Sequence, residues 1–192
     1  NAKNVNEKGR HLSFPFYNAS FFEENLSNLL KANKIRTFIL TKNNWAYDQG
    51  RIEESTLEKL ISSFRFLRAL DLHGLNMKML PDTIGTLMCL KYLDLSFNDI
   101  KDLPSSITKL VNLQTLKLFY CTNLKELPTD IGKLVSLKHL DIHGCKNLTH
   151  MPWGFGQLTS LQTLDLSCCT MLQELPTDIG KLVSLKHLDI HG

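Results

Sequence analysis

The chain has 192 residues, a formal net charge of +3 and 43% hydrophobic residues. This composition excludes a disordered chain, and the absence of a lysine and arginine cluster in its leucine-rich part argues against nucleic acid as a partner. The sequence contains no stretch of about 18 uninterrupted apolar residues, so we expect no membrane-spanning segment and no insertion into a membrane. The opening residues 1–10 show no signal peptide, and we expect them to lie inside a longer protein.

The first third of the chain, residues 1–66, holds 7 of the 36 leucines and has an irregular pattern. Apolar residues spaced by two positions predict short strands around 12–14 and 38–40. Two stripes at helical spacing predict helices. The stripes are Leu26, Leu29 and Leu30, and then Leu57, Leu60, Ile61 and Phe64. We therefore expect irregular N-terminal repeats with two convex helices in 1–66.

The remaining residues, 67–192, form regular repeats of about 24 residues, a period in the range typical of stacked repeat proteins. The pattern LxxLxL returns six times, beginning at Leu67, Leu90, Leu113, Leu137, Leu161 and Leu185. A second pattern, L-P-x-x-I/F-x-x-L, lies between successive copies of the first. Apolar residues at period 2 predict a strand, and the proline that follows suits a turn or the start of a short helix. Each unit is too small to bury its own leucines, so the repeats must stack. The sequence therefore predicts an α/β solenoid with a parallel concave sheet and short convex helices or turns.

The two patterns together resemble the leucine-rich repeat family. Five segments are more specifically similar to the repeat domain of plant intracellular nucleotide-binding leucine-rich repeat disease resistance proteins of the coiled-coil type. These segments are 10–14, 35–40, 66–72, 90–96 and 113–118. The resemblance implies a cytoplasmic module that senses a pathogen effector or a modified host protein. It also implies that residues from Arg10 to about Leu72 hold the nucleotide-binding domain of the same parent chain inactive.

Two other functions stay open from the sequence. An extracellular receptor ectodomain is one, because Asn18, Asn25 and Asn147 each match the N-glycosylation sequon. Against it, extracellular plant repeats resemble NxLxGxIPxxL, whereas this chain has leucine or methionine before each repeat proline and lacks that glycine. A cytosolic repeat scaffold of the Ras-group type is the other, because LPxxI is compatible with both classes.

Five cysteines bear on the compartment. Cys121, Cys145 and Cys169 recur once per repeat at one position, and Asn98 holds the same place in an earlier repeat. A side chain at that place should turn inward and bond to the backbone of the neighbouring coil. An odd number of cysteines in a regular ladder indicates buried, reduced thiols rather than disulfides, and this favours an intracellular location.

The concave face is the candidate protein-binding surface, because residues between the inward leucines point to solvent. Lys117, Phe119 and Tyr120 form a basic and aromatic patch in an acidic column, and aromatic residues beside charges often anchor interfaces. The alternative is a solvated strand face with occasional ion pairs. The candidate residues are Asp71, Tyr92, Asp94, Lys117, Phe119, Tyr120, His139, Asp141, His143 and Asp165.

Catalytic and metal-binding signals are weak. The sequence contains no GxSxG, HExxH, CxxC or GxxxxGK[ST] pattern, so we predict neither an enzyme nor a cofactor. His139, Asp141 and His143 share one strand face and could approach a metal, as could their copies at 187–191. That surface is open and offers no evident fourth ligand, so we predict no metal site.

The segments 113–144 and 161–192 are identical at 27 of 32 positions. Three of the five differences lie on or beside the concave strand, where Lys117, Phe119 and Tyr120 are replaced in the second copy. The identical remainder indicates either a recent duplication or deliberate engineering. Residue 192 directly follows the sixth strand, so we expect a truncated array whose open last repeat could associate end to end with another copy.

Overall fold

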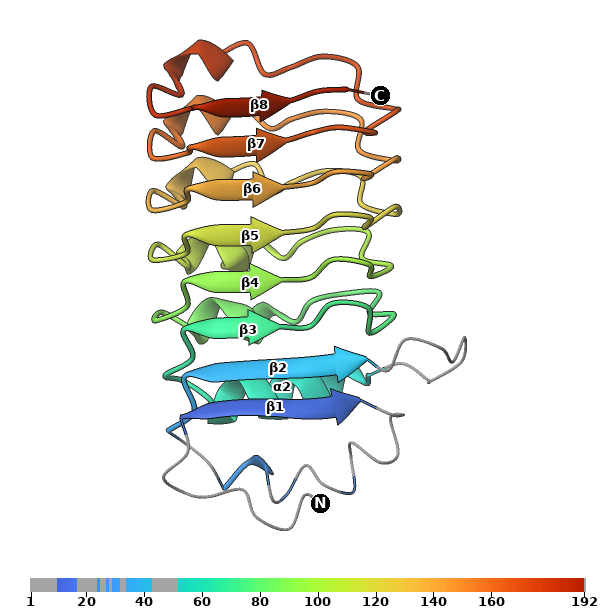
Figure 1. The fold of residues 1–192 in the computed structure, drawn as a ribbon, viewed down its shortest axis with the longest axis vertical. Coiled ribbons are helices and arrows are strands. Elements are labelled where there is room, and N and C mark those ends of the chain that lie inside the picture. The colour runs from blue at the N-terminus through green and yellow to red at the C-terminus, as the bar shows by residue number, and fades with distance from the viewer. Residues whose placement is uncertain are drawn as a thin grey trace.

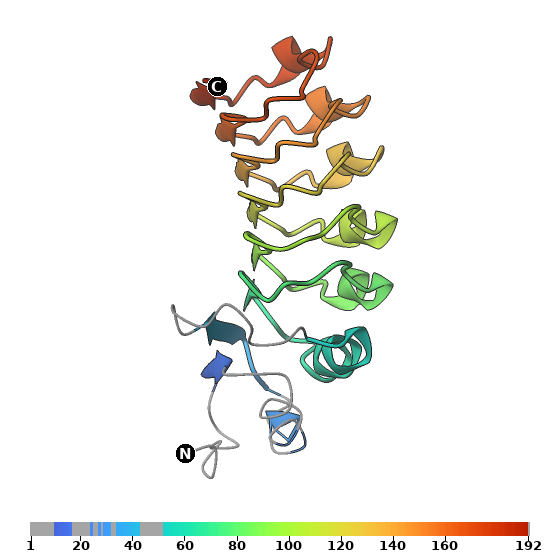
Figure 2. The same cartoon turned by 90° about the vertical axis from the view of Figure 1, so that its right-hand side faces the viewer.

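The computed structural model describes residues 10–16, 24, 27, 29–31, 34–42 and 52–191. Its strands lie side by side in chain order and form one parallel eight-stranded sheet (Figure 1). Seen edge-on, the strands occupy one side of the stack and the helices occupy the other (Figure 2). The strands are β1 (His11–Phe16), β2 (Thr37–Lys42), β3 (Ala69–Asp71), β4 (Tyr92–Asp94), β5 (Thr115–Lys117), β6 (His139–Asp141), β7 (Thr163–Asp165) and β8 (His187–Asp189). The α/β solenoid predicted from the leucine spacing is confirmed.

The repeat period sets the register of the sheet. Leu70 pairs with Leu93 and Leu93 with Leu116, so the central leucines of neighbouring strands lie side by side. These three side chains are fully buried. Short strands of this kind bury one face each, and stacking joins those faces into one continuous core. The core therefore runs the length of the solenoid, between the sheet and the convex elements.

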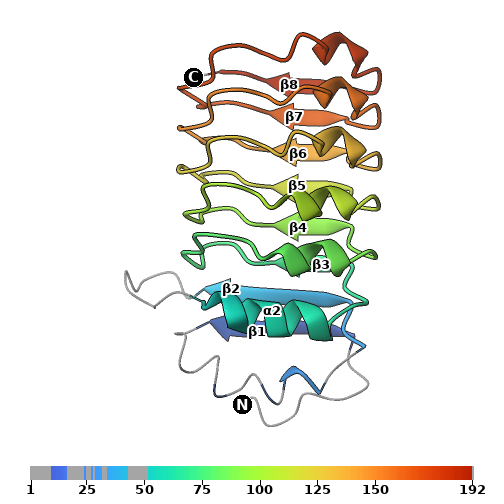
Figure 3. The same cartoon turned by 180° about the vertical axis from the view of Figure 1, so that it is seen from behind.

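The convex side carries one described α-helix and then single helical turns (Figure 3). The helix α2 (Glu54–Ser63) buries Leu57, Leu60 and Ile61 along one face. Phe64 at its end packs against Phe38 of β2, with ring centroids 5.5 Å apart. The turns are the 3-10 helices η2 (Asp82–Thr86), η3 (Ser105–Lys109), η4 (Ile131–Lys133), η5 (Phe155–Gln157) and η6 (Ile179–Lys181). The earlier predicted helix around 26–30 lies mostly outside the described residues, as do Asn18 and Asn25.

The inward ladder of Asn98 and three cysteines has the contacts predicted for it. The side-chain oxygen Oδ1 of Asn98 accepts hydrogen bonds from the backbone N–H groups of Leu75 and Met77 in the preceding coil, at 3.1 and 3.0 Å. In the later repeats the thiols of Cys121, Cys145 and Cys169 each donate to a backbone carbonyl of the coil before, at 3.2 Å. All three thiols are free and buried. The ladder therefore joins neighbouring coils through hydrogen bonds instead of disulfides.

The last described strand, β8, has a neighbour on one side only. Leu188 of β8 is 40% exposed, whereas its register partner Leu164 on β7 is 1% exposed. Ile190 after β8 is also exposed. The apolar face that a further coil would cover is therefore open in the 192-residue chain. Among the described residues, no helix has both the length and the apolar character needed to cross a bilayer.

Candidate functional site

The structure brings all ten candidate residues onto five neighbouring strands, β3 to β7, and the turns that follow them. The register aligns Asp71, Asp94, Lys117, Asp141 and Asp165 in one column across the concave face. Neighbouring strands in a sheet lie roughly 5 Å apart, so each side chain of the column has its equivalents as neighbours. The predicted acidic column interrupted by a lysine is therefore a real feature of the surface.

The aspartates of this column also hold the backbone. Each uses a carboxylate oxygen to accept the N–H of the residue two positions later, which ends the strand in an Asx turn. The distance is 3.0 Å from Asp94 to the Ser96 nitrogen and 2.9 Å from Asp165 to the Ser167 nitrogen. Asp94 additionally accepts the Tyr92 hydroxyl at 3.0 Å and is only 6% exposed. The aspartates of the column thus stabilise the strand ends as well as carrying negative charge. Asp94 is buried, and its main effect at the surface is to hold the Tyr92 hydroxyl.

Lys117 lies beside the Tyr92 ring and among acidic residues of the neighbouring strands. Its Nζ lies 5.9 Å from the centroid of the Tyr92 ring, a cation–π distance. Burial raises the pKa of the neighbouring Asp141 carboxyl, the repulsion of Asp165 adds to this rise, and the His143 N–H and the Lys117 charge oppose it. Burial and the Asp94 charge likewise raise the pKa of the Tyr92 hydroxyl. Lys117 is therefore the cation that interrupts an otherwise anionic strip.

Beside Lys117, four rings form what we call the aromatic cluster: Phe97, Phe119, Tyr120 and His143. Phe97 and Tyr120 stack with their planes 5° apart and their centroids 5.3 Å apart. Phe119 meets Phe97 edge-on at 4.9 Å, and His143 meets Tyr120 edge-on at 5.0 Å. Phe97 is 51% exposed and Tyr120 is 40% exposed. The cluster is therefore a packed aromatic surface that is partly open to solvent.

Sequence reasoning missed Phe97, although a signal was present. Phe97 lies one repeat before Tyr120, at the same place in the repeat. Two aromatic residues one repeat apart lie on neighbouring coils and can stack. Comparison of the residues after each strand, repeat against repeat, would therefore have found the pair.

The backbone that carries the cluster is strained. Phe97 and Tyr120 have φ of 56° and 54°, in the left-handed region that favours glycine. The next repeat has Gly144 at this place, with φ of 70°. A Cβ on Gly144 would lie 2.9 Å from Cδ1 of Tyr120, so the tyrosine ring lies directly against the glycine. Left-handed non-glycine residues cost on the order of 1 kcal/mol each. Cys168 takes the same conformation at this place in the duplicate, so the strain belongs to the turn of the repeat.

The profile of the family described as "Leucine-rich repeat region" matches residues 51–192. The chain belongs to this family. No curated protein matches the chain. The leucine-rich repeat neighbours are solved structures, and their likeness to this chain concerns the fold alone, because the highest identity among those described below is 23%.

Three of these solved structures illustrate the likeness in fold. A leucine-rich repeat protein of Leptospira interrogans superposes with a TM-score of 0.72 at 23% identity, over 94% of this chain and 47% of that one. The leucine-rich repeat domain of the type III effector XopL gives 0.53 at 20%, over 98% and 78%. An internalin of Listeria monocytogenes gives 0.55 at 19%, over 85% and 50%. This leucine-rich repeat chain therefore spans about half the length of two of these three proteins.

The concave face of the leucine-rich repeats presents aromatic, imidazole and carboxylate side chains. Among residues 10–16, 24, 27, 29–31, 34–42 and 52–191, no group of three or more histidine, cysteine or acidic side chains could hold a metal ion. The imidazoles of the HxDxH segment face neighbouring hydroxyls, with His139 Nδ1 2.9 Å from Thr163 Oγ1 and His143 Nδ1 2.6 Å from Ser167 Oγ. Large aromatic side chains with few rotatable bonds anchor protein interfaces. The surface is suited to binding another protein.

Proposed function

We propose that these leucine-rich repeats recognise a protein through the concave face, as the sensing and autoinhibitory module of an intracellular plant immune receptor in the cytoplasm. The observation that carries the proposal is the exposed aromatic cluster with Lys117 beside it. It combines a cation and exposed, stacked rings on one patch. A patch with these properties has no role in the buried core, so a partner accounts for it better than folding does. The partner is a pathogen effector or a modified host protein.

The internal duplication supports this assignment. The copy two repeats later has Asp165, Ser167 and Cys168 in place of Lys117, Phe119 and Tyr120, while 126–144 and 174–192 are identical. Three of the five differences thus fall at Lys117 and the aromatic cluster, the other two follow at Asn123 and Lys125, and the convex turns are unchanged. A change concentrated on one exposed patch is what a shift in binding preference would produce.

A row of basic residues supports the second part of the proposal, contact with the nucleotide-binding domain of the same parent chain. Arg10, Arg36, Arg68 and Lys91 precede four successive strands, and each lies beside the next because its carbonyl accepts the next one's N–H, at 2.6 to 2.8 Å. Phe66 lies beside this row and is 60% exposed. Four cations around an exposed ring favour an acidic protein surface, because opposite charges steer and orient association.

Reading the transcript upstream of Asn1 is the first test. We expect a GxxxxGK[ST] domain that runs in frame into this chain. A signal peptide directly upstream would instead support an extracellular receptor ectodomain. If neither feature is present, a cytosolic Ras-group-type scaffold would be the better assignment. Either of these last two results would overturn the immune-receptor proposal.

Binding measurements then separate the two surfaces. Replacing Lys117, Phe119 and Tyr120 by alanine should weaken effector or host-protein binding and leave binding of the nucleotide-binding domain intact. Replacing Arg10, Arg36 and Arg68 by glutamate should do the opposite. The matched control for the first variant changes Ser167 and Cys168, the duplicate's equivalents of Phe119 and Tyr120, to alanine. Equal effects of the concave variant and its control would refute the role of the aromatic cluster.

For the 192-residue chain, end-to-end association through the exposed face of β8 is a separate proposal. Its support is the exposure of Leu188 and Ile190 on the uncovered face of β8. Light scattering over a concentration series should show a mass that rises with concentration. A strict monomer at high concentration would contradict it.

A further inference from the structure

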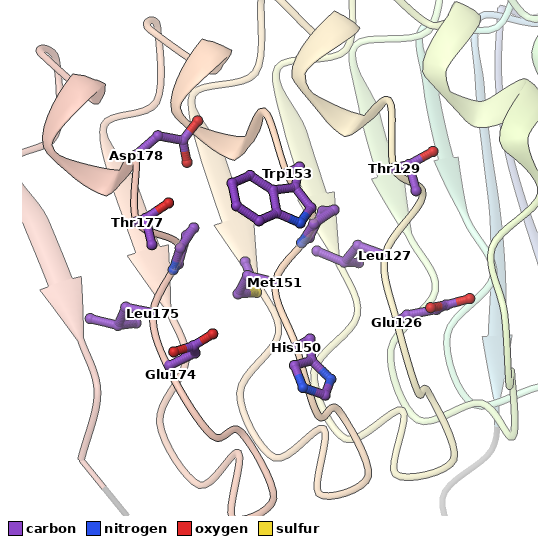
Figure 4. A pocket seen from close by; sticks show the side chains of 12 residues that line it. Glu126, Leu127, Thr129, His150, Met151, Trp153, Glu174, Leu175, Thr177 and Asp178 are labelled. Carbon is purple, nitrogen blue, oxygen red and sulfur yellow. The ribbon is translucent and has the colours of Figure 1, made fainter.

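A hollow of about 310 Å³ lies away from the aromatic cluster (Figure 4). It is formed by three neighbouring segments, 126–129, 150–153 and 174–178, which lead from β5, β6 and β7 to the 3-10 helices that follow them. None of the residues that line it belongs to a strand. The hollow is therefore a surface distinct from the concave face.

Trp153 lies on the middle segment of the three, at the edge of the hollow that faces the 3-10 helices (Figure 4). The two flanking repeats have Thr129 and Thr177 at the equivalent place, so tryptophan is the exception there. The small threonines leave the indole 82% exposed. Tryptophan is usually well buried, and an exposed one gains most from contact with a partner. Packing in the hydrophobic core therefore does not account for a tryptophan at this position.

The backbone around Trp153 is held on both sides. A Cβ on Gly132 of the coil before would lie 2.5 Å from the Gly154 carbonyl oxygen, which shows how closely these two coils approach. On the other side, the Gly156 N–H donates to a carboxylate oxygen of Asp178 in the coil after, at 3.0 Å. An anchor on a rigid backbone loses little conformational freedom when it binds. Trp153 is thus displayed in a defined position.

The charge around the indole is negative. The ionisable residues that line the hollow are Glu126, Glu174, Asp178 and His150, and the lining includes neither lysine nor arginine. Glu126 and Glu174 are exposed and lie on the coils on either side of Trp153 (Figure 4). An arginine guanidinium stacks on aromatic faces and pairs with carboxylates, and it is the side chain that suits both features at once.

We propose that the Trp153 hollow is a second binding site, which takes an arginine side chain of a protein partner. The guanidinium stacks on the indole, and the exposed carboxylates of Glu126 and Glu174 on the flanking coils attract its charge. This site does not depend on the concave face or on the identity of the receptor. A partner that used both surfaces would gain affinity from the second contact without any change in the first.

The test uses the 192-residue chain and a small probe, N-acetyl-arginine-N-methylamide, at constant ionic strength. The chain has two tryptophans, Trp45 and Trp153, and Trp153→Thr assigns their indole N–H signals in an NMR spectrum. We expect the Trp153 signal to shift saturably in the millimolar range and the Trp45 signal to stay in place. The citrulline analogue has nearly the same shape and no charge, and it should produce no comparable shift.

Charge variants complete the experiment. Glu126→Gln combined with Glu174→Gln should weaken arginine binding by roughly threefold or more. The matched control is Glu53→Gln combined with Glu58→Gln near α2, which should leave binding unchanged. The alanine variant of Lys117, Phe119 and Tyr120 should also bind the probe normally, so failure of this site is distinguishable from failure of the concave face. No shift at Trp153, an equal shift with citrulline, or full binding by the Glu126 and Glu174 variant would each overturn the proposal.

Discussion

Two glycines with the same local sequence should respond oppositely to alanine. Gly132 and Gly180 occupy the same place in the identical segments 126–144 and 174–192, and neither has a positive φ. Their intrinsic propensities and their unfolded states are therefore alike. The difference in the 192-residue chain is tertiary: a Cβ on Gly132 would meet the Gly154 carbonyl oxygen of the next coil at 2.5 Å, whereas this sequence holds no coil after that of Gly180, and a Cβ on Gly180 would meet nothing within 4 Å.

The expected change in the free energy of unfolding follows from the distance between the added Cβ and its nearest neighbour. The contact at Gly132 would be about 0.9 Å shorter than the 3.4 Å at which ordinary contact begins, and its partner is backbone, which cannot rotate away. Overpacking of this kind costs about 1–3 kcal/mol. Glycine to alanine also restricts the unfolded chain, which stabilises both variants by about 0.4–1 kcal/mol. We expect Gly132→Ala to lose about 1–2 kcal/mol and Gly180→Ala to be neutral or slightly more stable.

Urea denaturation of the 192-residue chain measures this difference. With a slope of about 2 kcal/mol per M, the midpoint of Gly132→Ala should lie about 1 M below that of Gly180→Ala. The far-ultraviolet circular dichroism signal reports the whole stack, and Trp153 fluorescence reports the coil that Gly132 touches. Equal midpoints would refute the reasoning, because the two sites would then differ in nothing that matters for packing.

Three further predictions concern the ladder and the aromatic cluster. Asn98→Ala should lower the unfolding free energy by about 2–4 kcal/mol, because it leaves buried N–H and carbonyl groups unpaired. The stability of Asn98→Cys should lie between that of Asn98→Ala and that of the parent chain. Equal melting temperatures of both variants and the parent in calorimetry would contradict this prediction. Burial raises the pKa of Cys121 and Cys169 from 9.0 to about 11. The contribution of these thiols to stability is present below pH 9 and is lost as pH rises through 11, so the urea midpoint should fall over that interval. Gly144→Ala should destabilise by about 1–2 kcal/mol and displace the Tyr120 ring, and unchanged tyrosine ring signals in NMR would count against the close contact.

The fold could be predicted from the amino-acid sequence alone. Leucines at LxxLxL spacing can be buried only by a short strand, and so short a repeat period can be satisfied only by stacking. The inward ladder of Asn98 and the cysteines followed from the same period. It also placed Lys117, Phe119 and Tyr120 on one exposed patch. These features depend on spacing along the chain, which the sequence displays directly.

The contacts between side chains of neighbouring coils came from the three-dimensional structure. In the structure Phe97 stacks on Tyr120, and Asp94 accepts the N–H of Ser96 in the turn that follows its strand. Trp153 is exposed between two coils that carry threonine at the same place. None of these contacts is encoded by spacing, because each depends on rotamers, on left-handed turns and on what the adjacent coil presents. Gly132 shows this most plainly, since a Cβ there would meet the Gly154 carbonyl oxygen of the adjacent coil.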